Sequence, residues 1–249
     1  MNILLVNDDG YFAEGINILE KYLTKIGHKI YVTAPSVEQS AKSHSMTINS
    51  SLYATEFSDG HFHISGSPAD CLIYSLKSNL LPVKPDLIIS GINHGYNLSS
   101  DILYSGTCAA ARQACLYGYR AIAISTERNA SKVFDFDQAA EFLVSNLDAF
   151  IEKLDSNAFL NINVPCNFSG RYELASIGEI DYDDQFTLEK MPDGRIKITN
   201  SGFNITYAEY CNSPYPKDYE VCNRGNASVS LIKILPEVSI THMEGFCEA

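Results

Sequence analysis

The sequence is short of basic side chains. Its 249 residues contain 18 Lys and Arg against 30 Asp and Glu, a formal net charge of −12 with histidine neutral. A surface of this sign repels polyphosphate backbones, so we expect no nucleic acid polymer as a partner. A small phosphorylated molecule is compatible with this charge if a local feature reverses the sign of the electrostatic field.

Three further features are missing, and each narrows the class of protein. No stretch approaches the roughly 20 uncharged apolar residues that a transmembrane helix needs, so we expect no membrane partner. The seven cysteines include no C-x-x-C pair and are odd in number, which predicts reduced thiols in the cytoplasm. The apolar start of the chain lacks a basic leader and is therefore not interpreted as a signal peptide.

The composition that remains is typical of a globular protein with a large core, with 45% hydrophobic and 19% charged residues. Up to Pro165, short apolar runs alternate with helical patterns. We expect strands at 3–6, 29–34, 87–90, 121–125 and 159–164, a hairpin over 52–57 and 61–65, and helices at 16–26, 67–79, 108–116 and 136–154. This order predicts an α/β fold with a Rossmann-like, doubly wound, mostly parallel sheet over residues 1–165.

After Pro165 the pattern changes. Apolar runs at 172–180, 196–199 and 229–234 predict strands separated by loops that contain proline and glycine. We therefore expect residues 166–249 to form a β-rich C-terminal extension that completes the fold.

Polar side chains follow several of the predicted strands, where the ligand crevice of an open α/β sheet lies. Asp8 and Asp9 follow the first strand, Ser40 lies in the loop after the second, and Asn93 follows the strand that ends at Ser90. Adjacent carboxylates repel each other unless a cation lies nearby, and hydroxyl and amide oxygens are hard donors that suit Mg²⁺ or Mn²⁺ better than zinc. The sequence predicts one divalent metal ion held by Asp8, Asp9, Ser40 and Asn93.

The segment Ser105-Gly106-Thr107 opens a predicted helix. Its unpaired backbone N–H groups and the positive end of the helix dipole form a ready site for phosphate, and Gly106 would let the anion approach the backbone. A metal ion and a helix N-terminus together predict metal-assisted hydrolysis of a phosphate ester. Asp8 or Asp9 could then act as the general base, with Asp9 preferred.

Two histidines, His44 and His94, lie in the same loops. The simpler interpretation is that both are solvated loop residues. Their location also makes each a candidate proton donor or substrate contact.

Four separated segments, residues 1–10, 66–71, 90–97 and 104–111, resemble the SurE family of stationary-phase survival proteins. The resemblance implies a metal-dependent 5′-nucleotidase that hydrolyses nucleoside 5′-monophosphates to nucleoside and phosphate, with broader activity on 3′-nucleotides and short polyphosphate as an open extension. It also implies that the chain forms a homodimer or homotetramer through its C-terminal extension. The resemblance assigns metal binding to Asp8, Asp9, Ser40 and Asn93, and phosphate binding to Asn97, Ser105, Gly106 and Thr107.

The chain departs from the family pattern in the loop after its second strand. Where the family usually reads Ala-Pro-Asp-Arg-Asn-Gln-Ser-Gly, residues 34–41 carry Val37 in place of the arginine and Ala41 in place of the last glycine, and His44 replaces a usual asparagine. We expect metal binding and hydrolysis to be retained, whereas base preference and rate could differ.

Three alternatives stay open at this point. A phosphatase of the haloacid-dehalogenase type would use Asp8 as a covalent nucleophile, but its two aspartates stand two residues apart, whereas Asp8 and Asp9 are adjacent. A signalling receiver module would need a phosphorylatable aspartate where this chain has Asn93. A non-catalytic nucleotide-binding protein would use the same side chains, because a sequence shows ligands and not rates.

Overall fold

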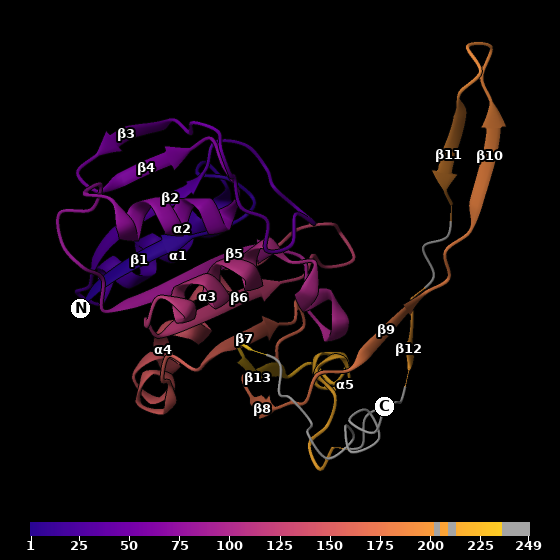
Figure 1. Ribbon diagram of the computed structural model, residues 1–249. Coiled ribbons are helices and arrows are strands. Elements are labelled where there is room, and N and C mark those ends of the chain that lie inside the picture. Colours follow the sequence, from indigo (N-terminus) through magenta and orange to yellow (C-terminus); the bar gives the residue numbers. More distant parts are fainter. Residues whose placement is uncertain (202–204, 209–212, 236–249) are drawn as a thin grey trace, which may run out of the picture.

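A nine-stranded sheet forms the centre of the computed structural model (Figure 1), which describes residues 1–201, 205–208 and 213–235. The strand order is β3-β4-β2-β1-β5-β6-β7-β13-β8. The strands of this sheet are β1 (Asn2–Val6), β2 (Lys29–Pro35), β3 (Ala54–Ser58), β4 (His61–Ile64), β5 (Leu87–His94), β6 (Ala121–Thr126), β7 (Ala158–Val164), β8 (Tyr172–Leu174) and β13 (Ala227–Lys233).

The centre of the sheet is parallel. The pairs β1–β2, β1–β5, β2–β4, β5–β6 and β6–β7 are all parallel, whereas β3 is antiparallel to β4 and β13 is antiparallel to β7. The mostly parallel α/β sheet that the sequence predicted is confirmed. Strand β5 is longer than expected, because it continues beyond Ser90 to His94 after a shift in its register with β6.

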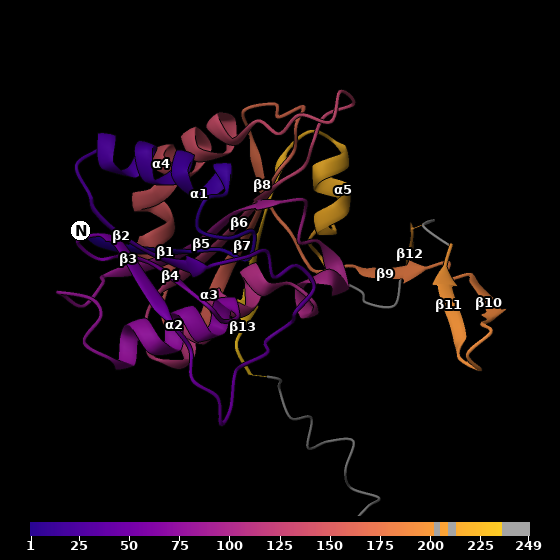
Figure 2. The ribbon, with the colours of Figure 1, turned by 90° about the horizontal axis from the view of Figure 1, so that it is seen from above.

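Helices cover both faces of the sheet (Figure 2). They are α1 (Glu14–Lys25), α2 (Pro68–Lys77), α3 (Gly106–Leu116), α4 (Phe136–Lys153), α5 (Asp218–Asn223) and the short 3₁₀ helix η1 (Ser99–Leu103). Helices α1 and α4 pack in one apolar cluster on one face, and α2 and α3 pack in a second cluster on the other. The central strands are therefore buried on both sides, which explains their unbroken aliphatic runs.

Local signals place the ends of two helices next to the sheet edge. Ser67 caps α2 by accepting a hydrogen bond from the Asp70 N–H, and Ser105 caps α3 by accepting one from the Cys108 N–H. Both caps satisfy backbone donors that have no partner inside the helix. The sequence predicted both helix starts from these residues.

The residues after Pro165 add two strands to the main sheet and also form two separate two-stranded sheets. The expected single strand at 172–180 is wrong, because its first part is β8 and its last residues belong to β9 (Glu179–Tyr182), which pairs with β12 (Ile205–Ala208) in a separate sheet. A further hairpin of β10 (Phe186–Lys190) and β11 (Ile196–Asn200) projects far from the body (Figure 1).

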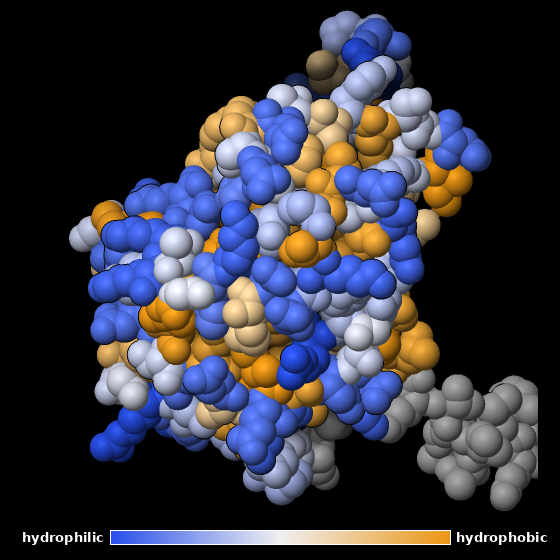
Figure 3. All heavy atoms as spheres, turned by 90° about the vertical axis from the view of Figure 1, so that its left-hand side faces the viewer, coloured by the Kyte–Doolittle hydropathy of each residue, from blue (hydrophilic) through white to orange (hydrophobic). Residues whose placement is uncertain are grey.

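Polar and apolar residues are mixed on the surface, and the described cysteines are unpaired. On the face shown in Figure 3, hydrophilic residues surround scattered apolar ones. No helix of the described residues is both long enough and apolar enough to cross a bilayer. The five described cysteines are unpaired, and Cys211 and Cys247 lie outside the described residues.

Candidate functional site

A tight turn after β1 fixes the two adjacent aspartates. The buried Asn7 side chain donates to the Gly10 carbonyl at 2.9 Å and accepts from the Gly10 N–H at 3.2 Å, so it bridges the turn. Gly10 has a φ of +106°, a backbone conformation that residues with a side chain rarely adopt. The turn therefore presents Asp8 and Asp9 together at the carboxyl edge of the sheet.

Asp8 lies against the start of α3. Its Oδ1 accepts a hydrogen bond from the Thr107 hydroxyl at 2.5 Å, and the residue is only 3% exposed. A Cβ on Gly106 would come within 2.8 Å of the Asp8 Cβ, so only glycine fits at this contact. Burial raises the pKa of Asp8, and hydrogen bonds, first that from Thr107, act in the opposite direction.

Asp9 lies on the other side of the turn, against β5. Its Oδ2 accepts from the His94 N–H at 3.2 Å, and its Oδ1 is 3.3 Å from His94 Nδ1. Burial, followed by the negative charges of Asp8 and Glu38, raises the pKa of Asp9 to about 7. The two carboxylates are thus close, desolvated and without a nearby positive charge strong enough to offset their repulsion.

Asn93 and Ser40 complete the set that the sequence placed at the metal. The Thr107 hydroxyl that donates to Asp8 also lies 3.2 Å from Asn93 Oδ1, so oxygens from the turn after β1 and from β5 meet at one hydroxyl. Ser40 lies in the loop after β2, and its hydroxyl donates to Glu38 at 2.8 Å. Asp8, Ser40 and Asn93 line one hollow of about 390 Å³, and Asp9 and Ser40 line a second of about 380 Å³ beside it.

Of the predicted phosphate-binding residues, Asn97 and Ser105 line the first hollow. Asn97 is held in place by β7, where the Asn161 and Asn163 amides donate to its carbonyl at 2.8 and 3.1 Å, and Asn163 also accepts from its N–H. Thr107 is fully buried behind Asp8, and Gly106 packs against Asp8. Their side chains therefore shape the aspartate, and their contribution to anion binding would come from the N-terminus of α3.

The two histidines differ in their placement. His94 lines both hollows and stacks on Phe134, with ring centroids 5.0 Å apart. His44 lines neither hollow, because its ring is turned to Gln113, with 2.9 Å between Nε2 and Oε1. Burial lowers the pKa of each histidine, so both favour the neutral form.

The charge around the hollows is one-sided. Among residues 1–201, 205–208 and 213–235, no lysine or arginine lines either hollow, whereas Asp8 lines the first and Asp9 and Glu38 line the second. Within the described part of the chain, no group of three or more histidine, cysteine or acidic side chains is arranged to hold a metal ion. The predicted donor set has a different composition, with two carboxylates and two neutral oxygens.

The structure adds residues that sequence reasoning did not place at the site. Glu38 accepts a hydrogen bond from Ser40, and Asp101, Tyr104 and Tyr182 are among the residues that line the first hollow. Glu38 follows a strand and could have been found by the rule used for Ser40. Tyr182 lies 81 residues from its partner Asp101, and no local spacing reports such a contact.

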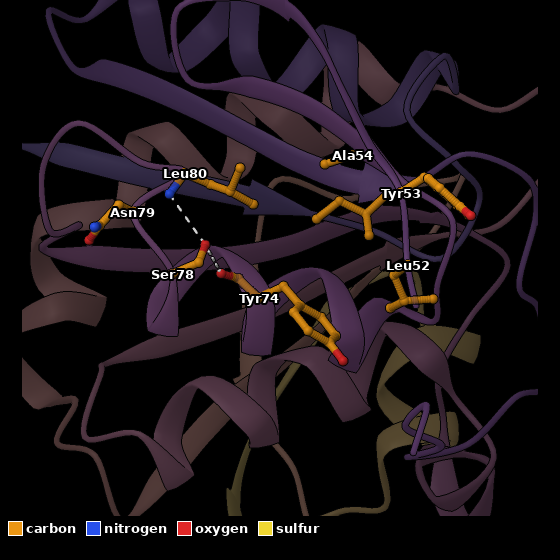
Figure 4. Close-up of a pocket in the computed structure, with 8 residues that line it drawn as sticks. Leu52, Tyr53, Ala54, Tyr74, Ser78, Asn79 and Leu80 are labelled. Atoms are coloured by element: carbon orange, nitrogen blue, oxygen red, sulfur yellow. Dashed lines mark hydrogen bonds between the residues drawn. The ribbon is translucent and has the colours of Figure 1, made fainter. Parts of the chain in front are cut away.

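A separate apolar hollow of about 260 Å³ lies between β3 and α2 (Figure 4). It is lined by Leu52, Tyr53, Ala54, Ile64, Tyr74, Ser78, Asn79 and Leu80. Its hydroxyl at Ser78 is already bonded, since it donates to the Tyr74 carbonyl and accepts from the Leu80 N–H. None of the predicted site residues lies in this hollow.

Comparison with known proteins gives a consistent result. The family model described as "Survival protein SurE" matches residues 3–184. Curated proteins named 5′-nucleotidase SurE are 36% identical in Geotalea daltonii, with 92% of each chain covered, and 33% identical in Myxococcus xanthus, with 98% of this chain and 94% of that one covered. The crystal structure of the SurE protein from Aquifex aeolicus superposes with a TM-score of 0.80 at 26% identity, covering 100% of this chain and 98% of that chain.

Proposed function

The chain belongs to the SurE family, and from this premise we propose that it is a metal-dependent 5′-nucleotidase that hydrolyses nucleoside 5′-monophosphates to nucleoside and phosphate. The observation that supports the proposal most directly is the meeting of Asp8, Asn93 and the start of α3 around one hydroxyl at the edge of a hollow. Family members of similar length carry the same activity in their names.

The residues present fit a divalent metal ion. Asp8 and Asp9 are adjacent, and burial and mutual repulsion raise the pKa of Asp9, which is the electrostatic condition that a cation would relieve. Ser40 and Asn93 add a hydroxyl and an amide oxygen, which are hard donors that suit Mg²⁺ or Mn²⁺. We propose these four residues as the ligands, which would leave further coordination positions for water and substrate.

The side chains around this set have separable tasks. A divalent ion bound there would polarise a phosphoryl oxygen and lower the pKa of a bound water. Asn97, fixed by β7, and the N-terminus of α3 at Ser105 would orient the phosphate at the wall of the hollow. Asp9 is the proposed general base, because it is less buried than Asp8, whose carboxylate accepts a hydrogen bond from the Thr107 hydroxyl.

The role of Asp9 is tested by Asp9→Asn. We expect phosphate release from adenosine 5′-monophosphate at saturating Mn²⁺ to fall by more than tenfold, because the amide neither accepts a proton nor offsets the ion's charge. Asp148→Asn, an exposed aspartate on α4, is the matched control and should retain the parent's rate. A rate within tenfold of the parent's for Asp9→Asn would contradict the assignment.

Metal dependence has its own experiment. Removing metal with EDTA should abolish phosphate release, and adding Mn²⁺ or Mg²⁺ should restore it. If no divalent ion gives hydrolysis but adenosine 5′-monophosphate still binds, a non-catalytic nucleotide-binding protein becomes the better description. Mass spectrometry for an aspartyl-phosphate on Asp8 separates the covalent mechanism from the direct one.

The projecting hairpin supports an oligomer. In its register Leu188 faces Ile198, and with Phe186 and Ile196 they form one apolar face whose four members are each more than half exposed. An isolated two-stranded hairpin is marginally stable in water, so this face needs a partner surface. We propose that residues 166–249 act as the C-terminal extension, that its hairpin packs against a second copy in a homodimer or homotetramer, and that the protein is cytoplasmic.

Leu188→Glu tests the oligomer. A charge in the middle of the apolar face should lower the molar mass measured by light scattering to that of a smaller species. Thr187→Glu adds the same charge to the same strand on the opposite face and should leave the mass unchanged. A parent protein that is monomeric at micromolar concentration would contradict the proposal.

A further inference from the structure

The lining of the first hollow includes residues outside the sets proposed to hold metal and phosphate. Among them are Asp101, Tyr104 and Tyr182. With a volume of about 390 Å³, the hollow lies in the size range of pockets for small organic ligands, which starts near 300 Å³. A phosphate group alone would leave most of this space unused.

The three side chains come from two parts of the chain that the fold brings together. Asp101 lies in η1. Tyr104 is the first residue after η1 and immediately precedes Ser105. Tyr182 is the last residue of β9, and its hydroxyl donates to Asp101 Oδ1 at 2.5 Å. The Ile180 N–H also donates to the Ser100 hydroxyl at 3.1 Å, so β9 is fastened to η1 by a second contact.

The chemistry of this wall suits a nucleoside. Tyr104 is 60% exposed and Tyr182 is 39% exposed, so aromatic surface remains open at the hollow. Aromatic side chains stack on nucleobases without needing a particular base. A carboxylate accepts several hydrogen bonds, and acidic side chains bind ribose hydroxyls in other nucleotide sites, so Asp101 can accept from a sugar as well as from Tyr182.

We propose that Asp101, Tyr104 and Tyr182 form the nucleoside subsite, with the carboxylate accepting hydrogen bonds from the ribose hydroxyls and the two rings packing against the base. This inference rests on the proposed function of the same hollow. It also assigns a task to the C-terminal extension, because β9 supplies Tyr182 and thereby completes the substrate site.

The second hollow is the competing place for the base. It is lined by Tyr11 and the 68% exposed Phe12, but its lining also includes the carboxylates of Asp9 and Glu38. Both rings already have aromatic partners, since Tyr11 and Phe12 meet edge-on at 5.0 Å and Tyr11 also stacks on Phe57 at 4.7 Å. The first hollow contains the proposed phosphate-binding residues and is therefore favoured.

The experiment compares substrates with and without a base. For the parent and each variant, kcat/KM is measured for adenosine 5′-monophosphate and for ribose 5-phosphate at saturating Mn²⁺. Tyr104→Ala and Tyr182→Ala should each lower the ratio of the two values about tenfold, as loss of one base-stacking ring does. Tyr182→Phe keeps the ring and should recover most of that loss, while Phe12→Ala should keep the parent's ratio within twofold.

The sugar contact is tested by Asp101→Asn. It should lower kcat/KM for adenosine 5′-monophosphate at least fivefold more than for the 2′,3′-dideoxy analogue, because only the first has the two ribose hydroxyls. Equal losses on both substrates would overturn the role of Asp101. A fall in the ratio for Phe12→Ala, with Tyr104→Ala unaffected, would place the base in the second hollow and overturn the proposal.

Adenosine binding, measured by calorimetry without turnover, separates this inference from the proposed function. Adenosine that binds the parent and binds at least fivefold more weakly to Tyr104→Ala supports the subsite even if no phosphate is ever released. Phosphate release that is normal in every variant, with an unchanged substrate ratio, keeps the hydrolase and removes the subsite.

Discussion

Replacing Gly106 by alanine tests how closely the start of α3 fits Asp8. The new Cβ would lie 2.8 Å from the Asp8 Cβ, 2.9 Å from its Oδ2 and 3.0 Å from Pro68 Cγ. Contacts this short force a movement, and the Asp8 side chain has little freedom because it is buried and bonded to Thr107. The helix start, the carboxylate or both must therefore shift.

The size of the effect follows from this crowding. Inserting one methyl group into a packed site costs about 1–3 kcal/mol, and about 1 kcal/mol lowers Tm by roughly 2–4 °C in a chain of this size. A catalytic group displaced by about 1 Å loses roughly 100-fold in rate. We expect Gly106→Ala to lower Tm by several degrees and to reduce phosphate release from adenosine 5′-monophosphate by about 10- to 100-fold.

Gly118→Ala at the other end of α3 is the matched control. Gly118 has a φ of +85° and no atom within 4 Å of an added Cβ, so the change costs about 1–2 kcal/mol through the backbone alone. It should lower Tm in the same range while retaining the parent's rate and its stabilisation by Mn²⁺. A Gly106→Ala protein that behaves like Gly118→Ala in both the rate assay and the Mn²⁺-dependent thermal shift would show that the start of α3 does not position Asp8.

Two further substitutions probe hydrogen bonds of the described residues. Thr107→Val removes the hydroxyl that donates to the buried Asp8 carboxylate, so the free energy of unfolding measured with denaturant should fall by about 1.5–3 kcal/mol. Thr107→Ser keeps a hydroxyl and should lower it by less than about 1 kcal/mol. Equal losses for the two variants would contradict the role of the hydroxyl. The His61 ring places Nε2 2.9 Å from Glu20, and this hydrogen bond is the main cause that raises the pKa of His61. Because the folded pKa is raised, the stabilisation is fully present below about pH 6.5 and is lost as pH rises through the folded value. His61→Gln should therefore lower Tm at pH 5.5 by an amount corresponding to about 0.2–1 kcal/mol and have less effect at pH 8.5; a loss that does not change with pH would show that the charge is irrelevant.

The parallel core was predictable because strands that are buried on both faces consist of continuous runs of aliphatic residues. β1 and β6 are short aliphatic runs covered on both faces, and each was expected within a residue or two of its bounds. The caps at Ser67 and Ser105 were equally readable, because a hydroxyl before a helix has one common use. Polar residues that follow parallel strands were expected to gather at one edge of the sheet, and Asp8 and Asn93 do line the same hollow.

The rest of the site depends on contacts that no local pattern reports. The strands of the projecting part have exposed residues on both faces, so hydrophobic alternation does not mark where β9 begins or which strand it pairs with. The run at 172–180 divides because Gly178 approaches Ser99 and Tyr219 closely and the chain changes sheets there. Tyr182 reaches Asp101 only through this change of direction.

An anionic substrate and a chain with a net charge of −12 are compatible because the relevant field is local. Charges on the outer surface are screened beyond about 8 Å at physiological salt, so the lining of the hollow decides what enters. The described residues of that lining include no lysine or arginine, and the N-terminus of α3 behind Ser105 supplies the partial positive charge there. Attraction from one helix end is modest, about 0.3–1 kcal/mol for an exposed group, and it is opposed by two carboxylates. The affinity for a nucleoside monophosphate should therefore depend far more on the divalent ion than on any basic side chain of the described residues.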